Sequence, residues 1–218
     1  MASVLFLVPN IVGHFRLLLI IVAIGASTLD HHVPALWIFG MSFVLDGLDG
    51  WFARRLNQAT QFGATYDVFI DIFARGFLWV NSLPQCSRSL ALVVILLECF
   101  TFVCTNADAV EELALSKGKE GHWKDAKAGP QWVKAVMANG FRSALGSVVV
   151  AGLHGCPLWV YSVRWTPHIL PHRTLLMHLG CIVVPGRILA AAVELTLIYN
   201  YLSKVARRDM QARQRNHS

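Results

Sequence analysis

The sequence carries little charge for its length. Of its 218 residues, 15% are Asp, Glu, Lys or Arg, whereas a soluble domain usually has about 25%. Hydrophobic residues make up 55% of the chain and gather in long runs. A chain with this balance is typical of a polytopic membrane protein, and a soluble domain is disfavoured.

The sequence also lacks several motifs that would indicate other classes of protein. None of its five cysteines forms a CxxC pair, so they are best interpreted as small core residues rather than as disulfides or a zinc site. The first residues contain no basic segment, and we therefore expect no cleavable signal peptide. The net charge of +6 comes without an aromatic-interleaved basic patch, so we expect no nucleic-acid partner.

The apolar runs predict six membrane helices in a single domain that covers residues 1–218. Each run has about 20 residues, which suits a hydrocarbon core of about 30 Å. An N-terminal interfacial segment leads into the first helix. The largest polar loop is expected at 109–131, an interfacial loop at 156–173 and a frayed basic tail at 204–218. The expected helices are 11–27, 35–56, 63–83, 89–108, 132–153 and 174–202.

Basic residues lie mainly in alternate connections, which predicts the orientation of the chain. One side carries Arg54, Arg55, Lys117, Lys119, Lys124, Lys127, Lys204, Arg207, Arg208, Arg213 and Arg215, and the other carries Arg88, Arg164 and Arg173. Cytoplasmic loops are enriched in Lys and Arg. We therefore expect an all-α membrane protein with both termini, and the facing ends of the second and third helices, on the cytoplasmic side.

Four aspartates lie at those facing ends. Asp46 and Asp49 are three residues apart, and Asp67 and Asp71 are four apart, so each pair projects from one face of its helix. A short link makes the two helices antiparallel neighbours, so the four carboxylates can converge. Ionisable groups at membrane depth are costly, and a set of four favours a functional site over the caps or solvated residues that single aspartates usually are.

Converging carboxylates need a compensating cation. An all-oxygen site selects a hard ion such as Mg²⁺ or Mn²⁺, and four acids suit two ions, the arrangement used for displacement at phosphorus. Gly50 would let a ligand approach the helix closely, and Arg54 can bind phosphate oxygens in a bidentate manner. A cation channel or transporter lined by acids is the alternative of a different class, and an inactive membrane scaffold is a third.

The motif Asp46-x-x-Asp49-Gly50-x-x-Ala53-Arg54, followed after eight residues by Gly63-x-x-x-Asp67-x-x-x-Asp71, resembles the full signature of the class I CDP-alcohol phosphotransferases. This resemblance implies a six-helix membrane fold and a centre of two Mg²⁺ or Mn²⁺ ions held by the four aspartates. It also implies transfer of a substituted phosphoryl group from a CDP-linked donor to an alcohol, with release of CMP.

Two flanking stretches are similar to the eukaryotic phosphatidylinositol synthases, a branch of this family. They are residues 8–13 with Arg16, and residues 54–64. This second resemblance implies CDP-diacylglycerol and myo-inositol as substrates, a homodimer and the endoplasmic reticulum membrane. Synthases of phosphatidylglycerophosphate, cardiolipin or phosphatidylserine are the alternatives within the same chemistry.

The resemblance also implies roles for individual residues. Asp71 would be the general base as well as a metal ligand. The residues expected to bind the CDP-diacylglycerol donor are Asn10, Gly50, Ala53, Arg54, Thr60 and Gly63. By themselves, Asn10 and Thr60 would be interpreted as a cap and a turn residue.

The acceptor alcohol requires a pocket of its own. Lys134 and Arg142 are eight residues apart and would share a face of the helix expected at 132–153, and Arg187 lies within the last helix. Cations can hydrogen-bond the hydroxyl groups of a polyol, although Lys134 could equally reach the interface. Glu98 and Glu194 are isolated acids that we expect to pair with a buried arginine.

Overall fold

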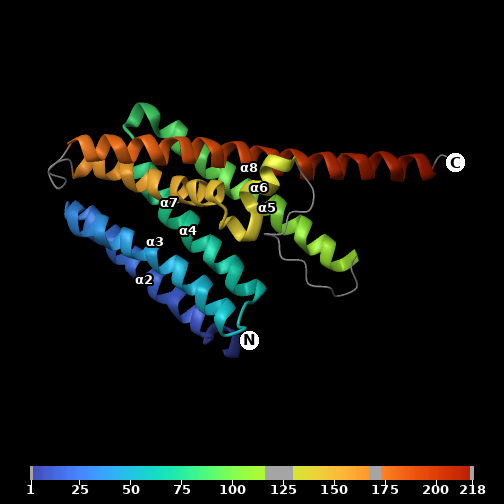
Figure 1. Ribbon diagram of the computed structural model, residues 1–218, viewed down its shortest axis with the longest axis horizontal. Helices are drawn as coiled ribbons and strands as arrows, with labels where there is room; N and C mark the ends of the chain where they lie inside the picture. The colour runs from blue at the N-terminus through green and yellow to red at the C-terminus, as the bar shows by residue number, and fades with distance from the viewer. Residues whose placement is uncertain (1, 116–129, 167–172, 217–218) are drawn as a thin grey trace. The chain divides into compact units, whose positions relative to one another are not determined.

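The computed structural model describes residues 2–115, 130–166 and 173–216, and these residues are helical apart from short connections (Figure 1). No strand occurs among them. The predicted all-α class is therefore confirmed. The helices are α1 Ala2–Leu5, α2 Val8–Thr28, α3 His32–Arg55, α4 Gln61–Ser82, the short 3₁₀ helix η1 Gln85–Ser87, α5 Arg88–Leu115, α6 Gln131–Phe141, α7 Ala144–Trp165 and α8 Arg173–Asn216.

Within the described parts of the chain, five segments are long and apolar enough to cross a membrane. They are Val8–Thr28, His32–Arg55, Gln85–Asp108, Ala144–Trp165 and Thr174–Arg215. Helix α4 has 22 residues, but Asp67, Asp71 and Arg75 interrupt its apolar sequence, and it is not among the five. The sixth span therefore stays a prediction.

Large apolar side chains on these helices are exposed. Trp37 and Val44 on α3, Leu96 on α5 and Ile188 on α8 are examples. Contiguous apolar surface is rare on soluble monomers, and a bilayer would cover it. Length, composition and exposure together indicate an integral membrane protein.

The chain divides into two compact units. The first comprises residues Met1–Ile95 and His154–Gly180, and the second comprises Leu96–Leu153 and Cys181–Ser218. The boundaries fall inside α5, α7 and α8, so each of these helices contributes to both units. In the first unit α2 packs against α3 and α4, around a core that includes Ile20, Phe39, Ile70 and Tyr161.

The link between α3 and α4 is short because each helix end is closed locally. Asn57 adopts a left-handed conformation with φ 52°, and Gln58 N–H donates to the Ala53 carbonyl at 2.9 Å, which ends α3 in a Schellman motif. Thr60 then caps α4, its hydroxyl oxygen accepting from Gly63 N–H at 3.0 Å. This link brings the aspartate-bearing ends together, as the sequence predicts.

The prediction of one helix at 132–153 is wrong, because this stretch is divided between α6 and α7. Gly140 and Phe141 have φ values of 67° and 66°, which a continuing helix cannot accommodate. The Ser143 hydroxyl oxygen then accepts from Gly146 N–H at 3.0 Å, closing the start of α7. The glycine and the serine were local signals for this break.

Two further expectations are corrected. Residues 156–165 belong to α7, with Pro157 inside the helix, rather than to an interfacial loop; membrane helices tolerate proline. Helix α8 continues through the tail expected to fray, where Lys, Arg, Gln and Ala are strong helix formers. Most of the polar loop expected at 109–131, residues 116–129, lies outside the described residues, as do residues 167–172.

Candidate active site

The four signature aspartates lie together in the first unit. Asp46 and Asp49 come from the last three turns of α3, and Asp67 and Asp71 come from the first half of α4. Asp46, Asp49 and Asp67 can each offer one oxygen atom such that the three atoms lie within 4.8 Å of one another. The convergence inferred from their spacing is thus present, while their role as metal ligands stays a prediction.

Arg16 from α2 occupies the centre of this group. Its side chain is fully buried, with 0% exposure. Its Nε donates to the Ser42 carbonyl at 3.2 Å. Nitrogen-to-oxygen distances from its guanidinium are 2.9 Å to Asp46, 2.6 Å to Asp49, 2.5 Å to Asp67 and 2.6 Å to Asp71. A planar guanidinium with five donors can serve several carboxylates at once, so Arg16 holds both aspartate pairs to α2.

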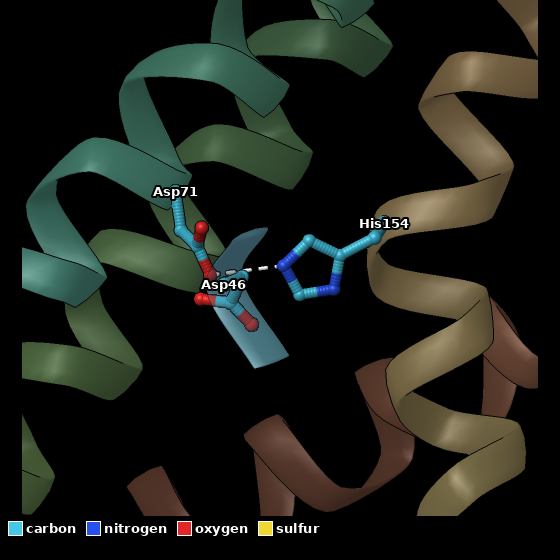
Figure 2. Close-up of side chains that lie close together, drawn as sticks. All are labelled: Asp46, Asp71 and His154. Atoms are coloured by element: carbon cyan, nitrogen blue, oxygen red, sulfur yellow. Dashed lines mark hydrogen bonds and ion pairs between the residues drawn. The ribbon is translucent and has the colours of Figure 1, made fainter. Parts of the chain in front are cut away.

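Asp71 has two more partners on its second carboxylate oxygen. Arg75 Nη1, one turn further along α4, lies 3.0 Å from Asp71 Oδ2. His154 Nε2, from α7, lies 2.9 Å from the same oxygen. Figure 2 shows the imidazole ring of His154 directed toward Asp71 and Asp46. Asp71 is therefore the most heavily paired of the four carboxylates.

The residues present fit divalent cations. Four carboxylates lie together here, and Arg16 and Arg75 each bring a guanidinium group to them. The side chains of Asp46 and Asp67 remain 24% and 31% exposed, so the cluster is partly open to its surroundings. Carboxylate oxygens are the ligands that Mg²⁺ and Mn²⁺ prefer.

Three of the residues expected to bind the donor meet where α2 and α4 begin. A Cβ atom on Gly63 would lie 2.8 Å from Asn10 Oδ1 and 3.1 Å from Thr60 Oγ1. Asn10 is buried, and its side-chain amide donates to the Val4 carbonyl at 2.6 Å. A larger residue at position 63 would therefore force the Asn10 side chain to shift.

The other three lie on the last turns of α3. Arg54 is exposed, and its guanidinium folds over Gly50, where an added Cβ atom would lie 3.3 Å from Arg54 Nη1. Ala53 is partly exposed next to them. Arg54 therefore lies on the exposed side of the last turns of α3, where a phosphate group can reach it.

The residues expected to bind the acceptor lie in the second unit. Lys134 is exposed on α6, and Arg142 is exposed just after α6 ends. The prediction that they share a face of one continuous helix is wrong. Gly140 and Phe141, which lie between them, have positive φ values and end α6. Their part in acceptor binding stays a prediction.

Arg187 is buried in the second unit and paired there. Its Nη1 lies 3.0 Å from Glu194 Oε2, and its Nη2 lies 3.3 Å from Glu98 Oε1. The expected pairing of the two glutamates with a buried arginine is confirmed. α7 and α8 pack closely beside this group, because a Cβ atom on Gly152 would collide with the backbone at Gly186 and Arg187.

Sequence reasoning missed three parts of the site. The sequence places Arg16 only within a stretch similar to known enzymes, and it indicates no role for Arg75 or His154. The available signal was the burial rule: an arginine or histidine inside an apolar run needs polar partners. That rule shows that partners exist, but not which of the aspartates they are.

Comparison with known proteins places the site in a family. The family profile described as CDP-alcohol phosphatidyltransferase matches residues 6–161. A CDP-diacylglycerol–inositol 3-phosphatidyltransferase of Candida albicans is 37% identical over 73 residues, which are 34% of this chain and 31% of that protein. One of Arabidopsis thaliana is 42% identical over 69 residues, which are 32% and 30% of the two chains.

A CDP-diacylglycerol–serine O-phosphatidyltransferase of Helicobacter pylori is 35% identical over 72 residues, which are 33% of this chain and 30% of that protein. Each of these matches thus spans less than a third of the relative's own length. No solved structure matches the chain. The family profile covers well over half of the sequence and includes all four signature aspartates, so this chain is a member of the CDP-alcohol phosphatidyltransferase family.

Proposed function

We propose that this protein transfers the phosphatidyl group of CDP-diacylglycerol to myo-inositol and releases CMP. The observation that carries the proposal is the convergence of Asp46, Asp49, Asp67 and Asp71 on one partly open cluster. The named activity of the Candida and Arabidopsis relatives supports it.

The four aspartates would hold two divalent cations, Mg²⁺ or Mn²⁺. When bound, such ions neutralise the diphosphate and the charge that develops on the departing CMP. Arg16 keeps the carboxylates in place before the ions arrive, because it joins all four to α2. The partly exposed side chains of Asp46 and Asp67 would give the ions a point of entry.

Asp71 would act as the general base. The hydroxyl oxygen of the acceptor forms a bond to the lipid-bearing phosphorus as its proton passes to Asp71. The bond from that phosphorus to the bridging oxygen breaks, and CMP leaves with the electron pair. Arg16, Arg75 and His154 hold the Asp71 carboxylate in a fixed position, and a general base must stay within hydrogen-bond reach of the hydroxyl group that it deprotonates.

The donor would bind across the ends of α2, α3 and α4. Arg54 would contact its phosphates through a bidentate hydrogen bond, and Asn10, Thr60 and Gly63 would line the path of the CDP group with Gly50 and Ala53. Acyl chains must remain in the bilayer while the head group reaches the cations. A site at the membrane boundary meets both needs, since α3 is apolar before its charged last turns.

The same proposal includes the finer topology. α4 would be a sixth span within a single domain, and the site and both termini would face the cytosol, following the distribution of basic residues. A homodimer in the endoplasmic reticulum membrane is carried over from the resemblance to eukaryotic enzymes. Lys134, Arg142 and Arg187 remain the candidates for contact with the acceptor.

A second candidate differs only in the acceptor. The Helicobacter relative is named for serine rather than inositol, and both names specify the same donor, CDP-diacylglycerol. A serine acceptor would keep every role proposed for the four aspartates and Arg54.

The experiment is an acceptor panel with the purified full chain in mixed micelles. Labelled CDP-diacylglycerol and Mg²⁺ or Mn²⁺ would be combined with inositol, serine, glycerol 3-phosphate or phosphatidylglycerol. We expect labelled phosphatidylinositol and stoichiometric CMP with inositol alone. Product from serine alone would replace inositol by serine, and no product from any acceptor, with donor still bound, would overturn the proposed transfer to these alcohols.

A further inference from the structure

We propose that His154 is a ligand of one of the divalent cations, adding a nitrogen to a site otherwise built from carboxylates. Its companions would be Asp46 and Asp71. The inference rests on the proposed two-cation site and extends it to a residue outside the signature, on a helix that the signature does not include.

The three side chains already form a group of the right size. One ligand atom from each of Asp46, Asp71 and His154 lies within 4.8 Å of the other two. The ring of His154 points its Nε2 edge at the two carboxylates (Figure 2). The His154 side chain is 15% exposed, so the group is sheltered but reachable.

The hydrogen-bond geometry at Nε2 places it where a cation could take the position of the ring hydrogen. Nε2 lies 2.9 Å from Asp71 Oδ2, which can only accept when ionised, and 3.1 Å from Arg75 Nη1, which can only donate. With the ring hydrogen on Nε2, His154 and Arg75 both donate to Asp71 Oδ2. With it on Nδ1, the lone pair of Nε2 faces Asp71 Oδ2, and a cation between these two atoms would bind both.

A cation shared by Nε2 and Asp71 Oδ2 satisfies all three groups. The lone pair of Nε2 would bind the ion. One lone pair of Oδ2 would do the same, and another would accept from Arg75 Nη1, which lies 3.0 Å away. The ring of Phe43 packs edge-on against the imidazole at 4.9 Å between centroids, which limits its rotation and keeps Nε2 directed at the site.

The choice of ion follows from the ligand type. Mg²⁺ prefers oxygen ligands and octahedral geometry, whereas Mn²⁺ belongs to the first-row series that also binds nitrogen ligands, although it is the weakest binder of that series. A nitrogen ligand at one of the two positions therefore favours Mn²⁺ over Mg²⁺ at that position, whereas the group of Asp46, Asp49 and Asp67 is all oxygen.

Pulsed electron paramagnetic resonance of bound Mn²⁺ tests this directly, with a readout independent of turnover. The purified full chain in micelles should show the ¹⁴N coupling of a coordinated imidazole. His154→Ala should bind Mn²⁺ through the remaining aspartates without that coupling. His14→Ala is the matched control and should retain it, because His14 contacts Tyr66 and belongs to neither candidate metal group among the described residues.

Competition between Mg²⁺ and Mn²⁺ for the site provides a second test of the role of His154. His154→Asp makes the group all oxygen, and it should lower the Mg²⁺ concentration needed to displace Mn²⁺ by at least about tenfold, the scale on which altered metal surroundings change affinity. Bound Mn²⁺ without ¹⁴N coupling in the unmodified protein would overturn the role of His154 and leave the carboxylate site intact. Failure to bind Mn²⁺ at all would overturn the proposed two-cation site as well.

Discussion

Arg16 Nη2, on α2, lies 2.6 Å from Asp71 Oδ1, on α4. Arg16 is fully buried in a segment long and apolar enough to span a membrane, where an unpaired guanidinium would be costly. The pair therefore stabilises the packing of α2 against α4 and also holds the residue proposed as the base. Stability and chemistry depend on the same contact.

Replacing Arg16 should destabilise the cation-free protein. Arg16→Met leaves four carboxylates without their shared partner, and removing one side of a buried ion pair costs about 3–5 kcal/mol. In EDTA, the midpoint of thermal unfolding in micelles should fall markedly. Adding Mn²⁺ should raise this midpoint more in the variant than in the unmodified protein, because the ion then replaces the missing positive charge.

Arg88→Met is the control for that measurement, since Arg88 is exposed at the start of α5 in the same unit. Its unfolding midpoint should change little with or without Mn²⁺. Equal unfolding of Arg16→Met and the unmodified protein in EDTA would show that Arg16 does not hold the aspartate cluster.

Asp71→Asn should separate chemistry from donor binding. The amide cannot take the acceptor's proton, and loss of a general base lowers rates by about 10²–10⁴-fold. CMP release should fall by that factor while binding of CDP-diacylglycerol, measured separately by fluorescence quenching, changes by only a few fold. Turnover at the unmodified rate would exclude Asp71 as the base.

Asp30→Asn provides the matched carboxylate control. Asp30 is exposed at the end of α2, in the turn before α3, and has φ 60°, a conformation that Asn adopts readily. This variant should fold and turn over normally. A comparable loss in Asp30→Asn would mean that the assay responds to surface charge rather than to the site.

The convergence of the four aspartates could be predicted because it depends on local rules. Helical spacing places Asp46 beside Asp49 and Asp67 beside Asp71, and the short link at Asn57 brings the pairs together. His154 could not be placed in the same way. It reaches Asp71 from 83 positions away in sequence, and no local pattern specifies such a pairing.

The predicted boundaries of α6 and α7 are wrong for a related reason. The apolar pattern continues across Gly140, so the break between α6 and α7 is carried by backbone conformation and the Ser143 cap rather than by hydrophobicity. Pro157 suggested a loop, yet it lies within α7. Proline is a weak boundary signal in membrane helices, because neighbouring helices and adjusted local geometry satisfy the freed backbone groups.

Gly50→Ala should weaken donor binding without weakening the fold. The added methyl group would lie 3.3 Å from Arg54 Nη1 and displace the guanidinium, whereas Gly47 on the same helix has nothing within 4 Å. Ala is more favourable than Gly in a helix by about 1 kcal/mol, so both Gly50→Ala and Gly47→Ala should keep or raise the unfolding midpoint.

Only the first of these two variants should raise the KM for CDP-diacylglycerol, by about tenfold if about 1.4 kcal/mol of binding is lost. Steady-state kinetics at saturating inositol measures the difference. Identical KM values for Gly50→Ala and Gly47→Ala would show that the position of Arg54 over Gly50 has no part in donor binding.

Variants of the buried group formed by Arg187, Glu98 and Glu194 can show whether Arg187 has a structural role or binds the acceptor. Arg187→Met leaves two buried glutamates without their cation, and we expect a loss of about 3–5 kcal/mol in unfolding free energy. Replacing all three residues by Met removes the charges together and should restore most of the stability, because an apolar group of similar volume no longer requires pairing. Lys204→Met, at the half-exposed pair with Asp108, is the control and should cost about 0–1 kcal/mol.

The triple variant also decides whether Arg187 contacts the acceptor. If the arginine serves packing alone, the refolded triple variant should keep the KM for inositol of the unmodified protein. If it binds the acceptor, that KM should rise while the KM for CDP-diacylglycerol stays the same. Both constants come from one set of CMP-release curves, so a rise in both would indicate a disturbed fold and exclude a specific contact between Arg187 and the alcohol.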